Sequence, residues 1–287
     1  MYAPEFDYYR AGSVAEAGDL LRKYPGAKLL AGGHSLIPLL KLRLTSPPVL
    51  IDIGRIDELK GITVSQGAIR IGALTTHAEL ASSRVLMEQC PALAEAAGQI
   101  GDPAVRNRGT IGGNLAHADP ASDLPTVLTA LGARFGITGP NGNRMEEAAR
   151  FFQGMMTTTL EEHDMLTAIE VPVKAAGQGM AYAKFVHPAS RYAVIGVAAV
   201  LTVSNGKCSA ASIALGGLVP QPVRASSVEK ALIGQTLSAD VIAKAANQVG
   251  SDLGSDILGD IFASAGYRKA VAPVWVKRAL TAAGQRI

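Results

Sequence analysis

The segment Arg106–Pro125, RNRGTIGGNLAHADPASDLP, decides how this chain is interpreted. It holds three glycines, two prolines and many polar residues between two apolar segments. Glycine lets backbone N–H groups approach a ligand closely, because no Cβ stands in the way. Residues 123–131 predict a short helix with Asp123 near its start. A glycine-rich loop that opens a helix suits a phosphate or diphosphate, and the alternative is a tight structural turn.

A second glycine-rich segment, LLAGGHSL at residues 29–36, repeats this chemistry. Here a short predicted strand runs into Gly32 and Gly33, and a helix is predicted over residues 37–44. The two glycines and Ser35 can present N–H groups and a hydroxyl to a phosphate. Neither segment fits the Rossmann or the P-loop glycine pattern. Two such turns indicate a single diphosphate held by both.

The composition is that of a globular protein. Of the 287 residues, 48% are hydrophobic and 18% are charged, and the formal net charge is only +3. The longest apolar run, residues 193–201, is far shorter than a membrane span. No basic-then-apolar leader is found over residues 1–10. We therefore expect no nucleic-acid partner, no direct membrane span, and a cytoplasmic location or arrival with a signal-bearing partner.

The cysteine and histidine content limits the redox chemistry of the chain. Its two cysteines, Cys90 and Cys208, cannot supply the four thiolates of an iron–sulfur cluster. The five histidines show no standard ligand spacing. A metal site at His117, Asp119 and Asp123 is one reading, but a turn suits their neighbours better, and Asp123 is expected to hydrogen-bond a ribityl or ribose hydroxyl. We predict no metal site, which leaves an organic cofactor for redox chemistry.

Hydrophobic periodicity predicts an α+β chain. A capping box at Ser13 and Glu16 starts the first expected helix, and Asn205-Gly206 marks a hairpin turn. The best linker candidate is Lys174–Gly179. Helices are expected over residues 13–24, 90–100, 226–233, 238–249 and 263–283, and a further helix is expected to begin at Thr75 or Thr76. Strands are expected over residues 27–31, 49–53, 62–72 (as a hairpin), 133–138, 165–173, 181–186, 195–203 and 207–215.

Several polar and aromatic residues have two interpretations. Lys184 lies in an apolar predicted strand, and it is either an outward-pointing edge residue or a buried residue with a partner. Tyr192 belongs to the core or covers a flat ring. His34 stabilises its own loop or lies beside a ligand. His77 is expected to be structural, and His163 to lie on a solvated face.

Together these motifs resemble the FAD-binding medium subunit of the molybdenum hydroxylases. This is the family of aerobic carbon monoxide dehydrogenase, xanthine dehydrogenase and bacterial N-heterocycle hydroxylases. The resemblance rests on AGGHS at residues 31–35 and TIGGN at residues 110–114, which match the family's two FAD loops. The carbon monoxide dehydrogenase-like branch often has Asp where this chain has Asn114. The likeness covers essentially the whole chain, through residues 121–125, 152–160, 164–172 and 187–197.

The resemblance implies an α+β fold. A two-lobed FAD-binding domain of the PCMH (vanillyl-alcohol-oxidase-like) type would occupy residues 1–55 and 56–176. A C-terminal domain over residues 177–287 would hold a three-stranded antiparallel sheet and a helical bundle.

The resemblance also implies the residues that bind FAD. Asp123 would bind the polar chain of the cofactor, Leu166 would contact it through its backbone, Lys184 would lie near the flavin, and Tyr192 would sit against the isoalloxazine ring. The whole implied set is Leu29, Leu30, Ala31, Gly32, Gly33, His34, Ser35, Leu36, Ile100, Thr110, Ile111, Gly112, Gly113, Asn114, Ala118, Asp123, Leu166, Lys184 and Tyr192.

The implied function is that of an electron-transfer subunit. FAD on this chain would accept electrons from the [2Fe–2S] clusters of a small subunit and pass them to an external acceptor. A large subunit would carry the molybdenum cofactor, and a dimer of heterotrimers is expected. We find no nucleophile triad or paired carboxylates and predict no catalytic acid or base. The alternatives are an autonomous FAD-dependent oxidoreductase and a non-catalytic diphosphate- or nucleotide-binding module.

Overall fold

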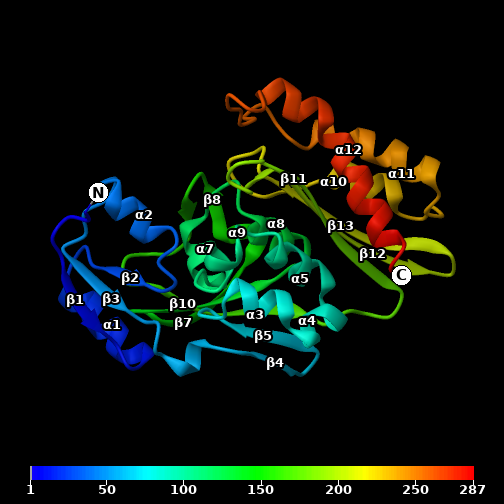
Figure 1. Ribbon diagram of the computed structural model, residues 1–287. Helices are drawn as coiled ribbons and strands as arrows, with labels where there is room; N and C mark the ends of the chain where they lie inside the picture. The colour runs from blue at the N-terminus through cyan, green and yellow to red at the C-terminus, as the bar shows by residue number, and fades with distance from the viewer. Residues whose placement is uncertain (1) are drawn as a thin grey trace.

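A computed structural model describes residues 2–287 and arranges them around three main sheets (Figure 1). Met1, with which the first predicted lobe begins, lies outside the described residues. The first sheet is parallel, with the order β1 (Asp7–Arg10), β3 (Val49–Asp52), β2 (Lys28–Leu30). Helices α1 (Val14–Lys23) and α2 (Leu36–Lys41) connect these strands. This small α/β unit forms the blue end of Figure 1.

The second sheet is antiparallel and has five strands. Its order is β4 (Ile62–Ser65), β5 (Ala68–Gly72), β10 (Met165–Pro172), β6 (Arg134–Gly139), β7 (Gly142–Glu147). The predicted hairpin over residues 62–72 is confirmed as β4 and β5. The last of these strands in the sequence, β10, lies in the middle of the sheet, so the sheet is complete only when the segment between β5 and β10 has folded.

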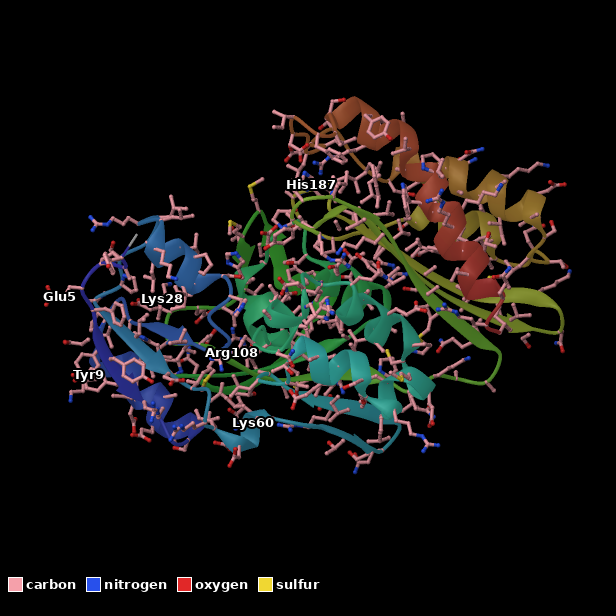
Figure 2. All side chains as sticks on the ribbon, in the orientation of Figure 1. Glu5, Tyr9, Lys28, Lys60, Arg108 and His187 are labelled. Atoms are coloured by element: carbon pink, nitrogen blue, oxygen red, sulfur yellow. The ribbon has the colours of Figure 1, made fainter. Side chains whose placement is uncertain are left out.

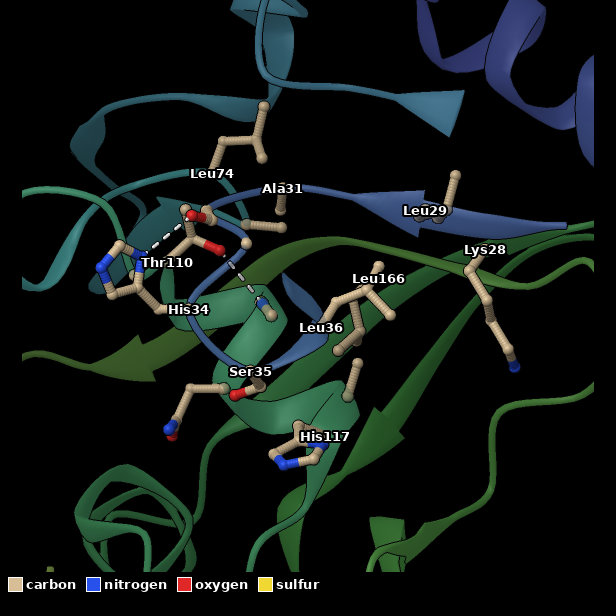
Figure 3. Close-up of a pocket in the computed structure, with 18 of the residues that line it drawn as sticks. Lys28, Leu29, Ala31, His34, Ser35, Leu36, Leu74, Thr110, His117 and Leu166 are labelled. Atoms are coloured by element: carbon tan, nitrogen blue, oxygen red, sulfur yellow. Dashed lines mark hydrogen bonds between the residues drawn. The ribbon is translucent and has the colours of Figure 1, made fainter. Parts of the chain in front are cut away.

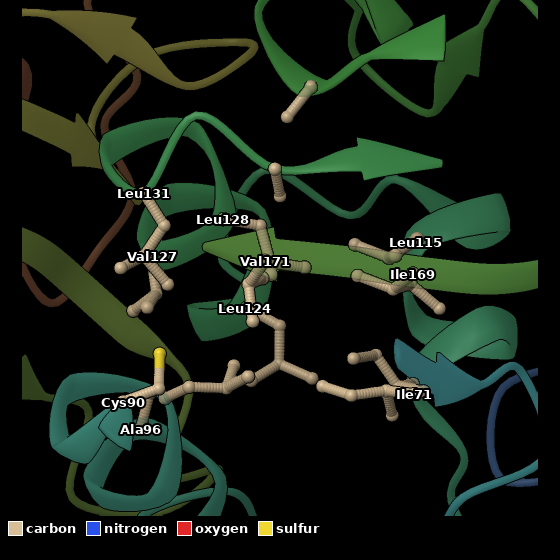
Figure 4. Close-up of a cluster of buried hydrophobic side chains, with 14 of the residues drawn as sticks. Ile71, Cys90, Ala96, Leu115, Leu124, Val127, Leu128, Leu131, Ile169 and Val171 are labelled. Atoms are coloured by element: carbon tan, nitrogen blue, oxygen red, sulfur yellow. The ribbon is translucent and has the colours of Figure 1, made fainter. Parts of the chain in front are cut away.

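The segment between β5 and β10 supplies most of the helices beside the second sheet. They are α3 (His77–Ser82), α4 (Arg84–Gln89), α5 (Pro91–Gly98), α6 (Pro103–Arg106), α7 (Ile111–His117), α8 (Asp123–Ala130) and α9 (Ala148–Phe151), followed by the small ribbon β8 (Phe152–Gly154) and β9 (Thr157–Thr158). Apolar side chains of α5, α7 and α8 pack on those of β5 and β10 (Figure 4).

The third sheet carries a strand that we did not predict. Its order is β11 (Gln178–Val186), β12 (Ala193–Ser204), β13 (Lys207–Gly216), β14 (Val223–Arg224). The predicted three-stranded sheet is thus four-stranded, because the chain reverses after β13 and pairs Val223 and Arg224 with its end. The predicted Asn205-Gly206 turn is confirmed, with positive φ at both residues.

The third sheet is covered on both faces. Even-numbered residues of β11, such as Met180, join the same apolar cluster as α5 and α8, whereas Ala181 joins that of the C-terminal helices. These helices are α10 (Ser226–Leu232), α11 (Ala239–Ala246) with the 3-10 turn η2 (Asn247–Ser251), and α12 (Ala265–Gly284). Burial on two faces explains why β12 is apolar at nearly every position. No helix within residues 2–287 is long and apolar enough to cross a bilayer.

Candidate cofactor-binding site

A cleft of about 710 Å³ opens between the first sheet, the helices beside the second sheet and the turn before β12. Its volume lies in the range of pockets that bind small molecules and cofactors, about 300–1,000 Å³. Residues of both glycine-rich segments line it (Figure 3). Residues of the β9–β10 connection line it as well. Lys28 and Arg108 lie in the region where the first sheet meets the rest of the chain (Figure 2).

The two glycine-rich segments touch each other. A Cβ on Gly32 would lie 2.0 Å from the carbonyl oxygen of Arg108, and a Cβ on Gly112 would lie 2.8 Å from that of Ala73. Gly33 has φ of 76°, in the left-handed region that favours glycine. The glycines are therefore required where backbones meet, and this contact leaves both turns facing one cleft.

Gly112 and Gly113 lie in the first turn of a helix, and the prediction of a loop up to Asp123 is wrong here. Helix α7 begins at Ile111 because Thr110 caps it: its Oγ1 accepts the N–H of Gly113 at 3.2 Å (Figure 3). The cleft-lining face of α7 includes Gly113, which has no side chain to cover the backbone. The N–H groups of Ile111 and Gly112 donate to the carbonyl oxygens of Thr75 and Ala73, so an anion in the cleft would meet the positive end of the α7 dipole rather than free N–H groups.

Most residues of the predicted set line this cleft. Four do not: Ile111 and Ala118 are buried in the core, Leu30 is half-buried beside it, and the Lys184 side chain is enclosed against Asp123. Those that line the cleft are Leu29, Ala31, Gly32, Gly33, His34, Ser35, Leu36, Ile100, Thr110, Gly112, Gly113, Asn114, Asp123, Leu166 and Tyr192.

Lys184 is a buried partner of Asp123, so the reading as an outward-pointing edge residue is wrong. Its side chain is 0% exposed, and Nζ lies 2.8 Å from Asp123 Oδ2. Tyr182 Oη donates to the other carboxylate oxygen at 2.5 Å. Burial raises the pKa of Asp123, and the ion pair with Lys184 opposes this rise. Our sequence reading missed Tyr182, although its position two residues before Lys184 puts both on one strand face.

The histidines are distributed differently from our expectation. His34 Nδ1 lies 3.1 Å from the carbonyl oxygen of Gly32, as expected of a residue that stabilises its own loop (Figure 3). The residue also lines the cleft, so its place beside a ligand stays a prediction. His163 lines the cleft and is half-buried, so the prediction of a solvated face is wrong. His77 is buried against Gly109 and also lines the cleft. Burial lowers the pKa of His77 to about 4, which keeps the ring neutral at neutral pH.

The acidic residues near α8 are occupied by protein partners. Asp119 accepts the N–H of Ala121, and Asp123 binds Tyr182 and Lys184. Within residues 2–287 no cluster of three or more histidine, cysteine or acidic side chains is arranged to hold a metal ion.

Tyr192 stands at the mouth of the cleft on a well-defined turn. The ring of His187 accepts the N–H of Ser190, and the His187 N–H donates to the Tyr192 carbonyl. Arg191, with φ of 60°, completes the turn. The Tyr192 side chain is 43% exposed. An aromatic ring held in this way is available to lie against a flat ligand.

These features fit FAD. The glycine turns and the N-terminus of α7 suit a diphosphate, and the half-exposed Tyr192 suits a flavin ring. Asn114 supplies a further signal: its Oδ1 is buried and has no hydrogen-bond partner among residues 2–287, while its Nδ2 donates to Ser122 at 3.1 Å. A buried amide oxygen without a donor is costly, and a donor from a bound molecule would remove this cost.

Comparisons with known proteins agree with this geometry. Residues 4–174 match the family model for the FAD binding domain in molybdopterin dehydrogenase, and residues 180–283 match the CO dehydrogenase flavoprotein C-terminal domain. The carbon monoxide dehydrogenase medium chain of Hydrogenophaga pseudoflava is 42% identical over 100% of this chain and 99% of its own length. The glyceraldehyde dehydrogenase medium chain of Sulfolobus acidocaldarius is 39% identical over 97% and 98%.

A solved structure of carbon monoxide dehydrogenase from Hydrogenophaga pseudoflava superposes with a TM-score of 0.95 at 43% identity, covering 100% of this chain and 99% of that one. The predicted family, fold class and FAD cofactor are thus confirmed, as is the role as an oxidoreductase subunit in a heteromeric molybdenum hydroxylase. The chain belongs to the family of FAD-binding medium subunits of the molybdenum hydroxylases.

Proposed function

We propose that this chain holds FAD in the cleft between its two glycine turns and serves as the flavin-containing electron-transfer subunit of a molybdenum hydroxylase. It receives electrons from the [2Fe–2S] clusters of a small subunit and delivers them to an external acceptor. A large subunit carries the molybdenum cofactor and oxidises the substrate. The observation that carries this proposal is the contact between Gly32 and Arg108, which brings two phosphate-binding turns to one cleft.

We assign the cofactor's diphosphate to residues 31–35 and 110–114. Their support is the glycine backbone and the capped start of α7. The orphaned Oδ1 of Asn114 is an acceptor and suits a hydroxyl group of FAD rather than its phosphates. Asp123 would bind the polar chain of FAD, because the residue lines the cleft and its carboxylate keeps unused acceptor sites. Leu166 would contact the cofactor through its backbone.

At the flavin end of the cleft we assign Tyr192 to the face of the flavin ring. Lys184 would lie near the flavin without lining the cleft, because its side chain is paired with Asp123, which does line it. When bound, FAD supplies the redox chemistry, since a flavin exchanges electrons singly or in pairs. The chain itself binds and orients the ring and sets its electrostatic surroundings. This agrees with our failure to find a nucleophile triad or paired carboxylates in the sequence.

We also propose the domain limits 1–55, 56–176 and 177–287, each built around one of the three sheets, and a dimer of heterotrimers in the cytoplasm. Support for the limit near residue 176 comes from the two family matches, which end at residue 174 and begin at residue 180. The oxidised substrate differs between relatives, two of which are named for carbon monoxide and glyceraldehyde. This selectivity belongs to the large subunit.

The test is to purify the chain with and without its partner subunits, record its visible spectrum and identify the chromophore released on denaturation. We expect an oxidised flavin spectrum and FAD. Candidate substrates should bleach the flavin only when the partners are present.

Two results would contradict the proposal. Bleaching by substrate without partners would indicate an autonomous oxidoreductase. A colourless chain that takes up no added FAD, even within the complex, would indicate a diphosphate-binding module.

A further inference from the structure

The hydrogen bond between Tyr182 and Asp123 has no place in the electron-transfer role just described. Tyr182 is 6% exposed and lies in β11, two residues before Lys184. Alternate residues of a strand point to the same face. Both side chains therefore reach the first turn of α8, where one donates to Asp123 Oδ1 at 2.5 Å and the other to Oδ2 at 2.8 Å.

The third sheet is shaped to allow this contact. A Cβ on Gly196 of β12 would lie 2.4 Å from Tyr182 Oη. Gly196 pairs with Lys184 on one side and with Gly216 on the other, and a Cβ on Gly216 would lie 2.1 Å from Thr126 Oγ1 of α8. Two paired glycines thus let α8 pack closely on the sheet and leave room for the tyrosine hydroxyl.

The arrangement uses about half of the hydrogen-bond acceptor sites of the Asp123 carboxylate and leaves the others unused. An ionised carboxylate has about four acceptor sites, of which Tyr182 and Lys184 use two. Lys184 is itself held by the carbonyl of Gln99 at 3.2 Å. Because Asp123 lines the cleft, its unused acceptor sites are available to a ligand. A buried carboxylate without donors would become protonated instead.

Other charged and titratable groups surround Asp123. Among residues 2–287, only Tyr182 and Lys184 donate hydrogen bonds to its carboxylate. The groups to be considered are Tyr182 and Lys184 of β11, Arg191 and Tyr192 before β12, Asp119 before α8, His117 of α7, and Glu95 of α5, which accepts the N–H of Tyr182.

We propose that Tyr182 is a positioning residue of the FAD site: acting through Asp123, its hydroxyl keeps the carboxylate ionised and turned so that its free acceptor sites face the polar chain of the cofactor. The inference rests on the proposed function, because it requires Asp123 to contact FAD. Tyr182 itself touches no cofactor atom in this account.

The test is a titration of FAD into the flavin-depleted complex, followed by visible absorption at several pH values between about pH 5 and pH 8. Tyr182→Phe should weaken FAD binding about tenfold at neutral pH, as expected for loss of one hydrogen bond to a charged group. As the pH is lowered, the FAD affinity of this variant should begin to fall at a higher pH than that of the wild type, because loss of a donor raises the pKa of Asp123.

Two further variants separate positioning from a structural effect. Tyr24→Phe is the matched control, since it removes a hydroxyl that bonds Tyr9 at 2.9 Å in the first sheet's cluster, and it should leave the FAD affinity and the pH profile unchanged. Gly196→Ala should reproduce the Tyr182→Phe profile by displacing the hydroxyl without removing it. It also keeps the test valid if Tyr182→Phe does not fold.

A double-mutant cycle gives the decisive comparison. In the neutral background Asp123→Asn with Lys184→Gln, the Tyr182→Phe change should have no further effect on FAD affinity. An equal loss in that background, or a wild-type pH profile for Tyr182→Phe, would overturn the inference and leave the proposed function intact. A wild-type complex that takes up no FAD would overturn the proposed function, and the inference with it.

Discussion

At the scale of single residues, the shape of the cleft depends on glycines, which have no Cβ atom. Gly32 and Gly112 lie where one backbone passes directly over another. A side chain at either position would push the two segments apart before any ligand arrived. The same positions are thus needed for packing and, under the proposed function, for binding, which makes their substitution informative on both.

Gly32→Ala should lose FAD and lower the free energy of unfolding by about 1–3 kcal/mol, the usual cost of overpacking. The new Cβ would lie 2.0 Å from the Arg108 carbonyl oxygen, which cannot move aside as a flexible side chain does. The flavin-to-protein ratio and the urea midpoint measure the two effects. Gly266→Ala, in α12 with open space around it, should keep FAD and gain up to about 1 kcal/mol. Full FAD occupancy in Gly32→Ala would contradict the packing argument.

His77 should make stability fall at mildly acidic pH. Its folded-state pKa of about 4 lies below the ordinary value of 6.5, so the unfolded chain binds the proton more readily. The contribution of His77 is fully present above pH 6.5 and is lost as the pH falls toward 4, up to about 3 kcal/mol. The free energy of unfolding should therefore depend less steeply on pH in His77→Gln than in the wild type across this range. Equal slopes in urea titrations would show that His77 is not buried in the neutral form.

At the scale of elements, the glycine motif at residues 110–114 was recognised in the sequence, but the start of helix α7 at Ile111 was not predicted. The glycine pair suggested a loop, because glycine is unfavourable inside helices. In the structure, the cap from Thr110 and the tight packing of Gly112 on Ala73 outweigh that preference. A glycine that tertiary contact requires carries no reliable information on local secondary structure.

Thr110→Val should lower the free energy of unfolding by about 1 kcal/mol, since it removes the oxygen that caps α7. It should also weaken FAD binding, because Thr110 and the Gly113 that it caps both line the cleft. Thr110→Ser keeps the hydroxyl and is the matched control. Thermal unfolding and FAD titration of both variants give the answer, and equal FAD affinities would show that the cap does not support the site.

At the scale of the whole molecule, the cleft is made by parts far apart in the sequence. Residues 31–35 connect β2 of the first sheet to α2, residues 110–114 belong to the helices beside the second sheet, and Tyr192 precedes the second strand of the third. Asp123 and Lys184 join α8 to β11 beneath it. A ligand that touches all these parts should therefore stabilise them together.

Added FAD should raise the unfolding temperature of the chain and make its parts unfold in one transition. Binding to the folded state alone contributes about 2.7 kcal/mol when free FAD is 100 times the dissociation constant. Calorimetry with and without FAD measures this, and ADP serves as a control for binding of the nucleotide half. If a separate, earlier unfolding transition remained and FAD did not shift its temperature, the unit around the first sheet would not take part in the site.

The family, the cofactor and most helices and strands could be predicted from the amino-acid sequence alone, because they depend on local signals. Glycine pairs after strands, capping residues and Asn-Gly turns act over a few residues and can be read one at a time. The α5 and α8 helices and the hairpin of β12 and β13 follow from such signals.

The pairing of the polar residues, in contrast, depends on tertiary packing. The burial of Lys184 on Asp123, the place of Tyr182 beneath the cleft and the positions of His77 and His163 beside it depend on which element packs on which strand face. A lysine in an edge strand can point either way, and the free energy that selects the inward position comes from a carboxylate 61 residues away in the chain. Local patterns do not contain that interaction.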